Sequence, residues 1–233
     1  PKLSLKINPS DMKNYKETEK NINVKNIFSN NRLTLSDSLE SGKSLTFGID
    51  YKKESIKNFN NYLEINLAKI FRDQEEFFIP QNTTINKKES NLFGSIKTSF
   101  NELIKFEHNF ALDKNYANLE YNELNTSINF KNLKSEFNFI KENGIMGNDS
   151  IFENSTKYEL NEDNSISFNT RRNRKLNLTE YYNLVYEYKN DCLTAGIKYN
   201  KTFYEDRELK PSENLFFSIT LIPLAEYEQK VSN

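Results

Sequence analysis

The 233-residue chain carries 32 basic and 33 acidic residues, and this near-balance excludes a polycationic surface for nucleic acid. Hydrophobic residues make up 36% of the chain, below the roughly 45–50% of typical soluble domains, which is too little to fill a thick two-sided core. The 18 Phe and 13 Tyr, many at alternating positions, exclude a disordered polymer. A wide barrel with a wet interior satisfies both observations, because only its outer band must be apolar.

Few residues of the chain suit catalysis or metal binding. One His and one Cys cannot assemble a multi-His or multi-Cys metal site, and no nucleophile-elbow, phosphate-loop, zinc-helix or calcium-loop motif occurs. His108 shares strand parity with Phe106 and Phe110, which favours a satisfied histidine on an apolar face over a catalytic base. We therefore predict no enzymatic activity and no cofactor.

Alternating hydrophobicity recurs along almost the whole chain. The longest apolar run is far shorter than the ~20 residues of a membrane-spanning helix, and no segment sustains a 3.6-residue period. The sequence instead predicts an all-β fold, an antiparallel up-and-down meander of about twelve strands that forms part of a large outer-membrane β-barrel. The expected strands cover residues 2–8, 44–53, 61–72, 92–100, 103–113, 116–130, 133–142, 152–160, 164–173, 178–189, 191–204 and 214–223.

The clearest pattern lies between residues 181 and 224. Two segments alternate with matching parity, and their apolar positions are Tyr182, Leu184, Tyr186 and Tyr188 in the first and Leu193, Ala195, Ile197, Tyr199 and Phe203 in the second. Only Asn190 and Asp191 separate them, and both residue types tolerate the positive φ of a tight hairpin turn. A third segment begins near residue 214, and after Pro223 the pattern stops.

The expected connections alternate in length along the chain. The long ones are 9–43, 73–91, 143–151 and 205–213, and the short ones are 101–102, 131–132, 161–163 and 190–191, with 54–60 and 114–115 as exceptions. Outer-membrane barrels have long extracellular loops and short periplasmic turns. This asymmetry predicts a barrel portion over 1–224 and a periplasmic C-terminal tail over 225–233.

The residues alone leave other classes of protein open. A porin or a siderophore-type receptor would share the strands and the loop asymmetry, and a soluble β-rich binding protein would share the strands. The chain begins at Pro1 without a Met, so we expect a piece of a longer protein. An incomplete barrel would leave unpaired edge strands near 2–8 and 214–223.

One basic cluster stands where a strand meets a long loop. It comprises Arg171, Arg172, Arg174 and Lys175. Guanidinium groups bind phosphate and carboxylate in a bidentate manner, so the cluster is a candidate contact for an anionic glycolipid. The alternative interpretation is a solvated barrel rim.

The C-terminal segments resemble the end of the LPS-assembly protein family LptD, in a form like that of alphaproteobacteria. The similar residues are YNLVYEYKNDCL at 182–193, KYNKTFYEDR at 198–207 and LFFSITL at 215–221. IFSNNR at 27–32 with LTFGIDY at 45–51 resembles an earlier loop and strand of the same barrel. The resemblance implies the C-terminal half of a very large outer-membrane barrel, without the periplasmic jellyroll domain that lies upstream in the family.

The resemblance also implies a function and partners. Members of the family insert lipopolysaccharide into the outer leaflet, with the lipoprotein LptE as a plug and LptA as the periplasmic donor. We therefore expect lipopolysaccharide, an LptE-like plug, an LptA-like bridge and outer-membrane lipid as partners, and no nucleic acid. The expected location is the cell outer membrane, with the C-terminus in the periplasm.

Cys192 is the only cysteine, so the chain cannot form a disulfide within itself. By itself it reads as a free thiol at the start of a strand. In the LptD family, a cysteine at this position forms a disulfide with the periplasmic domain, in a compartment that permits such bonds. The resemblance thus implies a disulfide from Cys192 to an upstream cysteine outside this chain. Leu193 follows where some relatives carry a second cysteine, so at most one such link forms.

Overall fold

The computed structural model describes residues 1–203, 211–221 and 225–231. Residues 204–210, which hold part of the expected 205–213 loop and of the 198–207 resemblance, lie outside the described residues, as do 222–224 and 232–233. The described part contains thirteen strands and one short 3₁₀ turn, η1 (Gln81–Thr83). None of its helical segments is long and apolar enough to cross a membrane.

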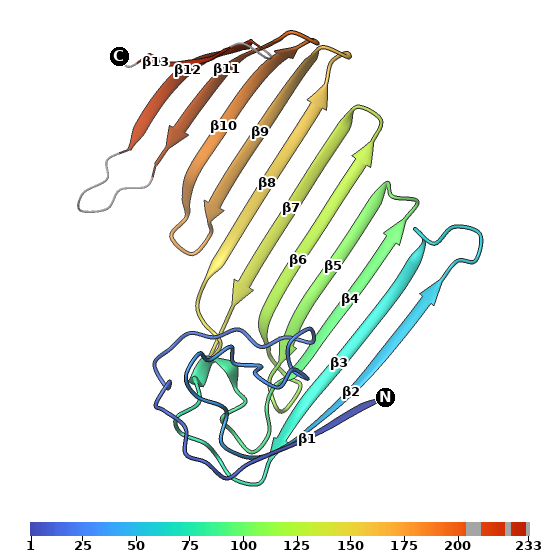
Figure 1. Cartoon of the computed structure of the whole chain (residues 1–233), viewed down its shortest axis with the longest axis vertical. Coiled ribbons are helices and arrows are strands. Elements are labelled where there is room, and N and C mark those ends of the chain that lie inside the picture. The colour runs from blue at the N-terminus through green and yellow to red at the C-terminus, as the bar shows by residue number, and fades with distance from the viewer. Residues whose placement is uncertain (204–210, 222–224, 232–233) are drawn as a thin grey trace. The chain divides into compact units, whose positions relative to one another are not determined.

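The strands follow one another in a single sheet whose order is the chain order from β1 to β13 (Figure 1). They are β1 (Lys2–Asn8), β2 (Gly42–Glu54), β3 (Tyr62–Arg72), β4 (Leu92–Phe100), β5 (Ile104–Leu112), β6 (Leu119–Phe130), β7 (Leu133–Glu142), β8 (Ser150–Glu159), β9 (Asn164–Asn173), β10 (Leu178–Lys189), β11 (Leu193–Thr202), β12 (Ser212–Leu221) and β13 (Ala225–Val231). The predicted all-β antiparallel meander is confirmed.

Two differences from the prediction are larger than the shifts of one or two residues at other strand ends. The strand expected from 116 begins only at Leu119, because Asp113 closes a turn by accepting hydrogen bonds from the Ala117 N–H at 2.8 Å and from Asn118 Nδ2 at 2.8 Å. The segment after 224 was expected as a tail, yet Ala225–Val231 forms β13 and pairs with β12. The edge of the sheet is therefore β13 rather than 214–223, whereas β1 is an edge as expected.

The sequence of β13 explains why pattern analysis missed it. The strand is short and rich in charge, with Glu226, Glu228 and Lys230 among its residues. Short length and charged side chains are common in edge strands, where they discourage pairing with another chain. The side of the membrane that the C-terminus faces remains a prediction.

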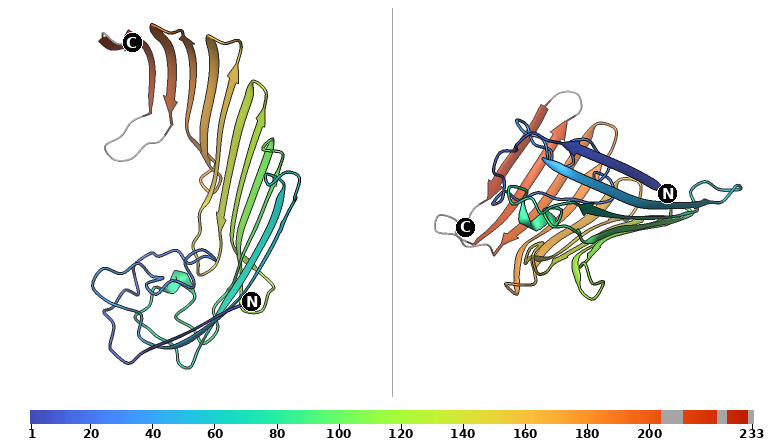
Figure 2. Two further views of the ribbon diagram at one scale, coloured as in Figure 1. Left: turned by 45° about the vertical axis from the view of Figure 1, so that its right-hand side comes forward. Right: turned by 90° about the horizontal axis from the view of Figure 1, so that it is seen from below.

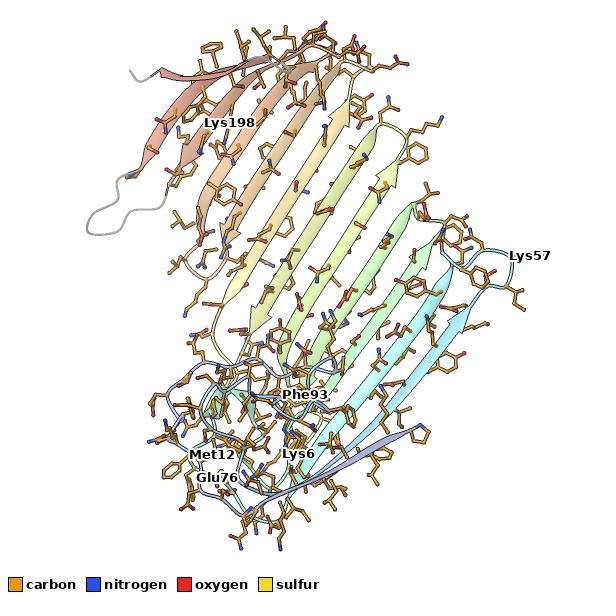
Figure 3. The ribbon with its side chains drawn as sticks, viewed as in Figure 1. Lys6, Met12, Lys57, Glu76, Phe93 and Lys198 are labelled. Atoms are coloured by element: carbon orange, nitrogen blue, oxygen red, sulfur yellow. The ribbon has the colours of Figure 1, made fainter. Side chains whose placement is uncertain are left out.

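The chain divides into two compact units, which we describe separately. The first comprises residues 1–101, 106–124 and 140–149, and the second comprises 102–105, 125–139 and 150–233. In the first unit, the loops 9–41 and 73–91 gather at one end of β1, β2 and β3 (Figure 2). Figure 3 shows Lys57, in the turn between β2 and β3, at the opposite end from Lys6 and Met12.

Along β2 in the first unit, apolar side chains are exposed and a polar side chain between them is buried, which is the reverse of the pattern in a soluble protein. Leu45 and Phe47 of β2 are 38% and 44% exposed, while Thr46 between them is fully buried. The cross-strand partners of these apolar residues, Leu5 and Leu3 of β1, are exposed as well. Apolar side chains that face outward along paired strands are expected where the surroundings are lipid.

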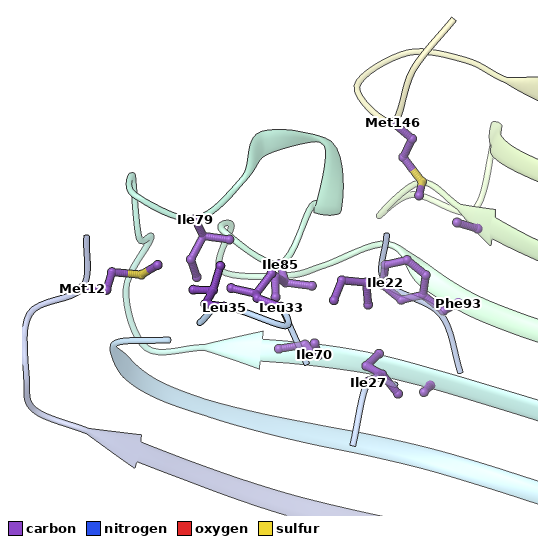
Figure 4. Close-up of a cluster of buried hydrophobic side chains, with 12 residues drawn as sticks. Met12, Ile22, Ile27, Leu33, Leu35, Ile70, Ile79, Ile85, Phe93 and Met146 are labelled. Carbon is purple, nitrogen blue, oxygen red and sulfur yellow. The ribbon is translucent and has the colours of Figure 1, made fainter. Parts of the chain in front are cut away.

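The polar face of β2 and β3 is covered by the two long loops, which we call the cap (residues 9–41 and 73–91). The cap encloses the hydrophobic core of this unit, together with small side chains of the sheet (Figure 4). The core residues are Met12, Ile22, Ile27, Leu33, Leu35, Ala68, Ile70, Ile79, Ile85, Phe93, Ala111 and Met146. The core thus lies between the loops and the polar side of the sheet.

The second unit repeats the same division between its faces. Antiparallel register aligns apolar residues of four strands in two rows, which are Phe168, Leu184, Tyr199 and Leu215, and Ile166, Tyr186, Ile197 and Phe217. All but one of these side chains are among the exposed large hydrophobic residues of the chain. The parity predicted for β10 and β11 is confirmed, and the apolar face of β12 continues the same surface.

A charge on this surface should destabilise the protein. We expect Ile197→Lys to lower the free energy of unfolding in bilayers by about 2–4 kcal/mol, the cost of a lysine near the bilayer midplane. Thr194→Lys, on the polar face of the same strand, is the matched control and should change it by less than about 0.5 kcal/mol. Denaturant titration of the full-length protein in vesicles measures both, and equal effects would contradict the assignment of the faces.

Candidate functional site

The cap is attached to the sheet through a buried ion cluster centred on Glu40. Arg32, only 1% exposed, donates from Nε to Glu40 Oε2 at 2.6 Å. The same guanidinium donates to Ser44 Oγ at 2.9 Å and Thr46 Oγ1 at 3.0 Å, both on the polar face of β2. Arg72, at the end of β3, also forms an ion pair with Glu40. One loop carboxylate therefore links the cap to two neighbouring strands.

A lysine of β1 extends this attachment. Lys6 Nζ donates to the carbonyl oxygens of Ser29 and Asn30 at 2.7 and 2.9 Å. Figure 3 shows Lys6 at the end of the strands where the loops gather. Three cations and one carboxylate thus surround the point where the cap meets the sheet. Sequence analysis missed this cluster because its residues come from loops and strand ends, where no periodicity marks a role.

The electrostatics of Glu40 follow from this arrangement. Burial alone would raise the pKa of the Glu40 carboxyl group, but the hydrogen bonds and the charge of Arg32, helped by Arg72, outweigh burial and lower the pKa below its ordinary value of 4.5. Glu40 therefore stays ionised well into the acidic range. The negative charge of Glu40 compensates the positive charges of the buried guanidinium groups of Arg32 and Arg72.

Acidification should loosen the cap. Because the folded state lowers the pKa of Glu40, its stabilising contribution is complete above 4.5 and is lost as the pH falls through the folded-state pKa. We expect Glu40→Gln to destabilise the cap by about 3–5 kcal/mol at neutral pH, the effect of leaving a buried charge unpaired. Hydrogen exchange of the amides of 9–41, corrected for intrinsic rates, measures both effects.

The control for this experiment is Glu17→Gln. The side chain of Glu17 is 91% exposed and forms only a 3.9 Å ion pair with Lys16. Exposed pairs contribute little, so this variant should exchange like the wild type. Unchanged exchange in Glu40→Gln would show that the ion cluster does not hold the cap.

The polar face of the first unit is charged and hydrogen-bonded beyond the cap. Glu107 of β5 forms ion pairs with Lys25 at 3.0 Å and Lys97 at 3.6 Å. Asn109 donates to the Glu123 carboxylate at 2.9 Å. These groups come from β4, β5, β6 and the cap, so a network of alternating charge lines this face.

His108 lies on the apolar face, as parity predicted. Its Nε2 is 2.8 Å from Asn122 Oδ1, and its ring contacts Phe110 with a centroid distance of 5.3 Å. The ring of Phe110 fills the space above Gly94, where a Cβ atom would be 2.1 Å from Phe110 Cζ. The interpretation of His108 as a satisfied histidine is confirmed.

The basic cluster is split between the two faces. Arg171 lies on the polar face, where it forms ion pairs with Glu153 at 2.8 Å and Glu180 at 2.7 Å. Arg172 lies on the apolar face, opposite Phe152, and donates to Asn177 Oδ1 at 2.6 Å.

The other two members of the basic cluster lie in the loop after β9. The guanidinium group of Arg174 lies 5.6 Å from the centre of the Phe139 ring. Lys175 is exposed in the same loop. The structure thus places Arg172, Arg174 and Lys175 near the loop end of the strands, and separates Arg171 from them.

Cys192 lies in the turn between β10 and β11 and is exposed. Asn190 Oδ1 accepts hydrogen bonds from the N–H groups of Cys192 at 3.0 Å and Leu193 at 2.8 Å. The turn residues are thus Asp191 and Cys192, one position later than expected. Because Cys192 precedes the strand, strand parity does not fix the direction of its side chain.

The described strands define a class of protein. Apolar side chains face outward and polar ones inward, and the strands are joined by long connections at one end and short ones at the other, which is the construction of an outer-membrane β-barrel wall. A family model agrees with this class. The model described as "LptD: LPS transport system D" matches residues 5–163, so the chain belongs to the LptD family of outer-membrane lipopolysaccharide transport proteins.

The match confirms the resemblance found in the sequence. It includes the stretch at 27–51 and ends before the C-terminal stretches at 182–221, on which the role of Cys192 rests. No curated protein matches the chain. Among solved structures, the chain is similar to a mutant of Rh. blastica porin, with 8% sequence identity and a TM-score of 0.40 over 82% of this chain and 84% of the porin.

Proposed function

We propose that this chain forms part of the barrel that inserts lipopolysaccharide into the outer leaflet of the outer membrane. The observation that carries the proposal is the LptD match over 5–163, a region in which the wall has an apolar outer face and a polar inner face. A glycolipid has the same two parts, because its acyl chains require an apolar surface and its saccharide requires a wet one. The action is transport, with no bond made or broken.

The loop lengths support an orientation in the membrane. The connections at 9–41 and 73–91 are long and those at 131–132 and 190–192 are short, so the cap belongs on the extracellular side. β12 then runs to the periplasmic end and β13 runs back from it, because Ala225 pairs with Leu221 and Val231 with Leu215, so this orientation does not support the C-terminus that the sequence predicted on the periplasmic side. An LptA-like bridge would deliver lipopolysaccharide from that side, and an LptE-like lipoprotein would plug the barrel.

Three basic residues suit the anionic groups of lipopolysaccharide. Arg172 shares its face with Phe168, and Arg174 lies over Phe139, so both cations stand beside apolar side chains at the extracellular rim. Lys175 lies in the same loop. Such a site would bind phosphate groups through the cations and acyl chains through the aromatic rings. Arg171 is excluded from it, because Glu153 and Glu180 engage its charge on the other face.

Depletion of the full-length protein should reduce lipopolysaccharide at the cell surface. Restoring the wild-type gene should reverse the loss, and the Arg172→Gln/Arg174→Gln double variant should reverse it only in part because the phosphate contacts are missing. Surface labelling of lipopolysaccharide at matched protein levels is the measurement. Normal surface lipopolysaccharide after depletion would refute the proposed function.

The control removes two exposed cations from the other end of the strands. Lys131→Gln/Lys189→Gln changes the net charge by the same amount at the periplasmic rim. This variant should restore surface lipopolysaccharide fully. Equal loss in both double variants would show that overall charge, rather than the extracellular rim, determines the result.

Cys192 is proposed to form a disulfide with an upstream cysteine. Its exposure in a short turn supports this role, because a thiol at the periplasmic rim is accessible to a domain below the barrel. We expect wild-type protein from oxidising cells and Cys192→Ser to migrate differently on a non-reducing gel, and identically after reduction. Full reaction of wild-type Cys192 with a thiol reagent before reduction would establish a free thiol instead.

A further inference from the structure

A row of asparagines crosses the polar face of the second unit. The registers pair Asn169 of β9 with Asn183 of β10, Asn183 with Asn200 of β11, and Asn200 with Asn214 of β12. Each of the four shares the face opposite to the apolar rows of these strands. We call these four residues the asparagine ladder.

Hydrogen bonds within the sheet satisfy the ladder only in part, since Asn214 Nδ2 donates to Ser212 Oγ at 3.3 Å. Asn183 Oδ1 and Asn200 Oδ1 are both buried and accept no hydrogen bond in the structure. Buried polar atoms without partners are rare, and each requires an explanation. An amide offers two donors and one acceptor, and rotation of the side chain exchanges the two ends. The two buried oxygens meet a ligand only when their side chains rotate, and the ladder then offers neutral groups for either a donor or an acceptor.

Aromatic rings border the ladder on both sides. Tyr181 stands in the next row toward the loops, paired with Arg171 and Thr202. Phe216 stands in the next row toward the short turns, paired with Lys198, whose Nζ lies 5.9 Å from the Phe216 ring centre. Figure 3 shows Lys198 on β11. Amide groups between aromatic rings suit a ligand that has hydroxyl groups at its edge and apolar C–H groups on its face.

We infer that the asparagine ladder binds the hydroxyl groups of a saccharide. The inference rests on the proposed function, since it assigns the saccharide part of lipopolysaccharide to this face. Adjacent strands are about 4.8 Å apart, close to the length of one pyranose unit, so successive asparagines meet successive sugars. Because the ladder carries no charge, it tolerates different sugars and holds each one weakly, as passage through a barrel requires.

The test measures binding of lipid-free oligosaccharide, released from lipopolysaccharide by mild acid, to the full-length protein in detergent. Saturation-transfer NMR should show binding by the wild type. Asn183→Leu/Asn200→Leu should weaken it about tenfold, because hydroxyl groups lose their partners at positions of nearly unchanged volume. Asn183→Gln/Asn200→Gln keeps the amides and should retain most of the affinity. Heat-dependent gel mobility checks folding, and Asn183→Ala/Asn200→Ala replaces the leucine variant if that variant does not fold.

The matched control is Thr194→Leu/Thr220→Leu. These two threonines are paired on the same polar face of β11 and β12, nearer the short turns. This variant makes the face equally less polar and should bind the oligosaccharide like the wild type. If both leucine variants weaken binding equally, the oligosaccharide binds to the polar wall in general and not to the ladder, and the inference is overturned.

Other outcomes separate this inference from the proposed function. If the wild type binds intact lipopolysaccharide and the ladder variants bind the oligosaccharide normally, the ladder inference fails and the proposed function stands. If the ladder variants lose a co-purifying protein but not the oligosaccharide, the ladder is a protein contact and the inference is overturned. If the wild type neither binds nor inserts lipopolysaccharide, the proposed function itself fails.

Discussion

Backbone pairing in the absence of water is the constraint on which this structure depends. In hydrocarbon, each unpaired N–H or C=O group costs several kcal/mol, so a strand that crosses a membrane must pair along its whole length. Within the described residues of the second unit, the pairings from β8 to β13 contain one register shift, between Thr179 and Tyr181. That shift lies near the loop end of β10, and Glu180 at the shift pairs with Arg171. Once pairing is fixed, the period of two decides which residues meet lipid.

The cap is stabilised by other interactions than the strands, because it consists of loops that pack on the polar face of the sheet. Its apolar residues, such as Ile22 and Ile27, each contribute about 1.5–3 kcal/mol by burial. A buried ion cluster is roughly neutral relative to apolar residues of similar size, since desolvation offsets attraction. The stability of the cap therefore comes mainly from its core. The cluster around Glu40 attaches the cap to the sheet, because Glu40 pairs with Arg72 of β3 and Arg32 donates to Ser44 and Thr46 of β2.

Sequence periodicity predicted the strands well and the sites poorly, for a physical reason. The bounds of β4, β7, β9 and β10 were predicted to the residue, because lipid on one side and water on the other impose a strict alternation. The contacts of Glu40 were not predictable, since they join residues far apart in the chain without any shared period. Similarly, strand parity predicts that Arg171 and Arg172 lie on opposite faces. The ion-pair partners of Arg171, Glu153 and Glu180, could be predicted only with knowledge of the strand register.

At the asparagine ladder, the residue type does not suit the secondary structure in which it stands. Asparagine is depleted in strands, whereas threonine is favoured there and is just as compatible with water. A wall that only needed to be wet would be more stable with threonine at all four positions. Four asparagines at one level of adjacent strands are therefore unfavourable for β10 and its neighbours, and the side-chain oxygens of Asn183 and Asn200 are buried there without a hydrogen bond. Sequences that violate a local rule in this way usually do so at sites that bind something. A ligand with many hydroxyl groups would supply the hydrogen bonds that the sheet itself does not.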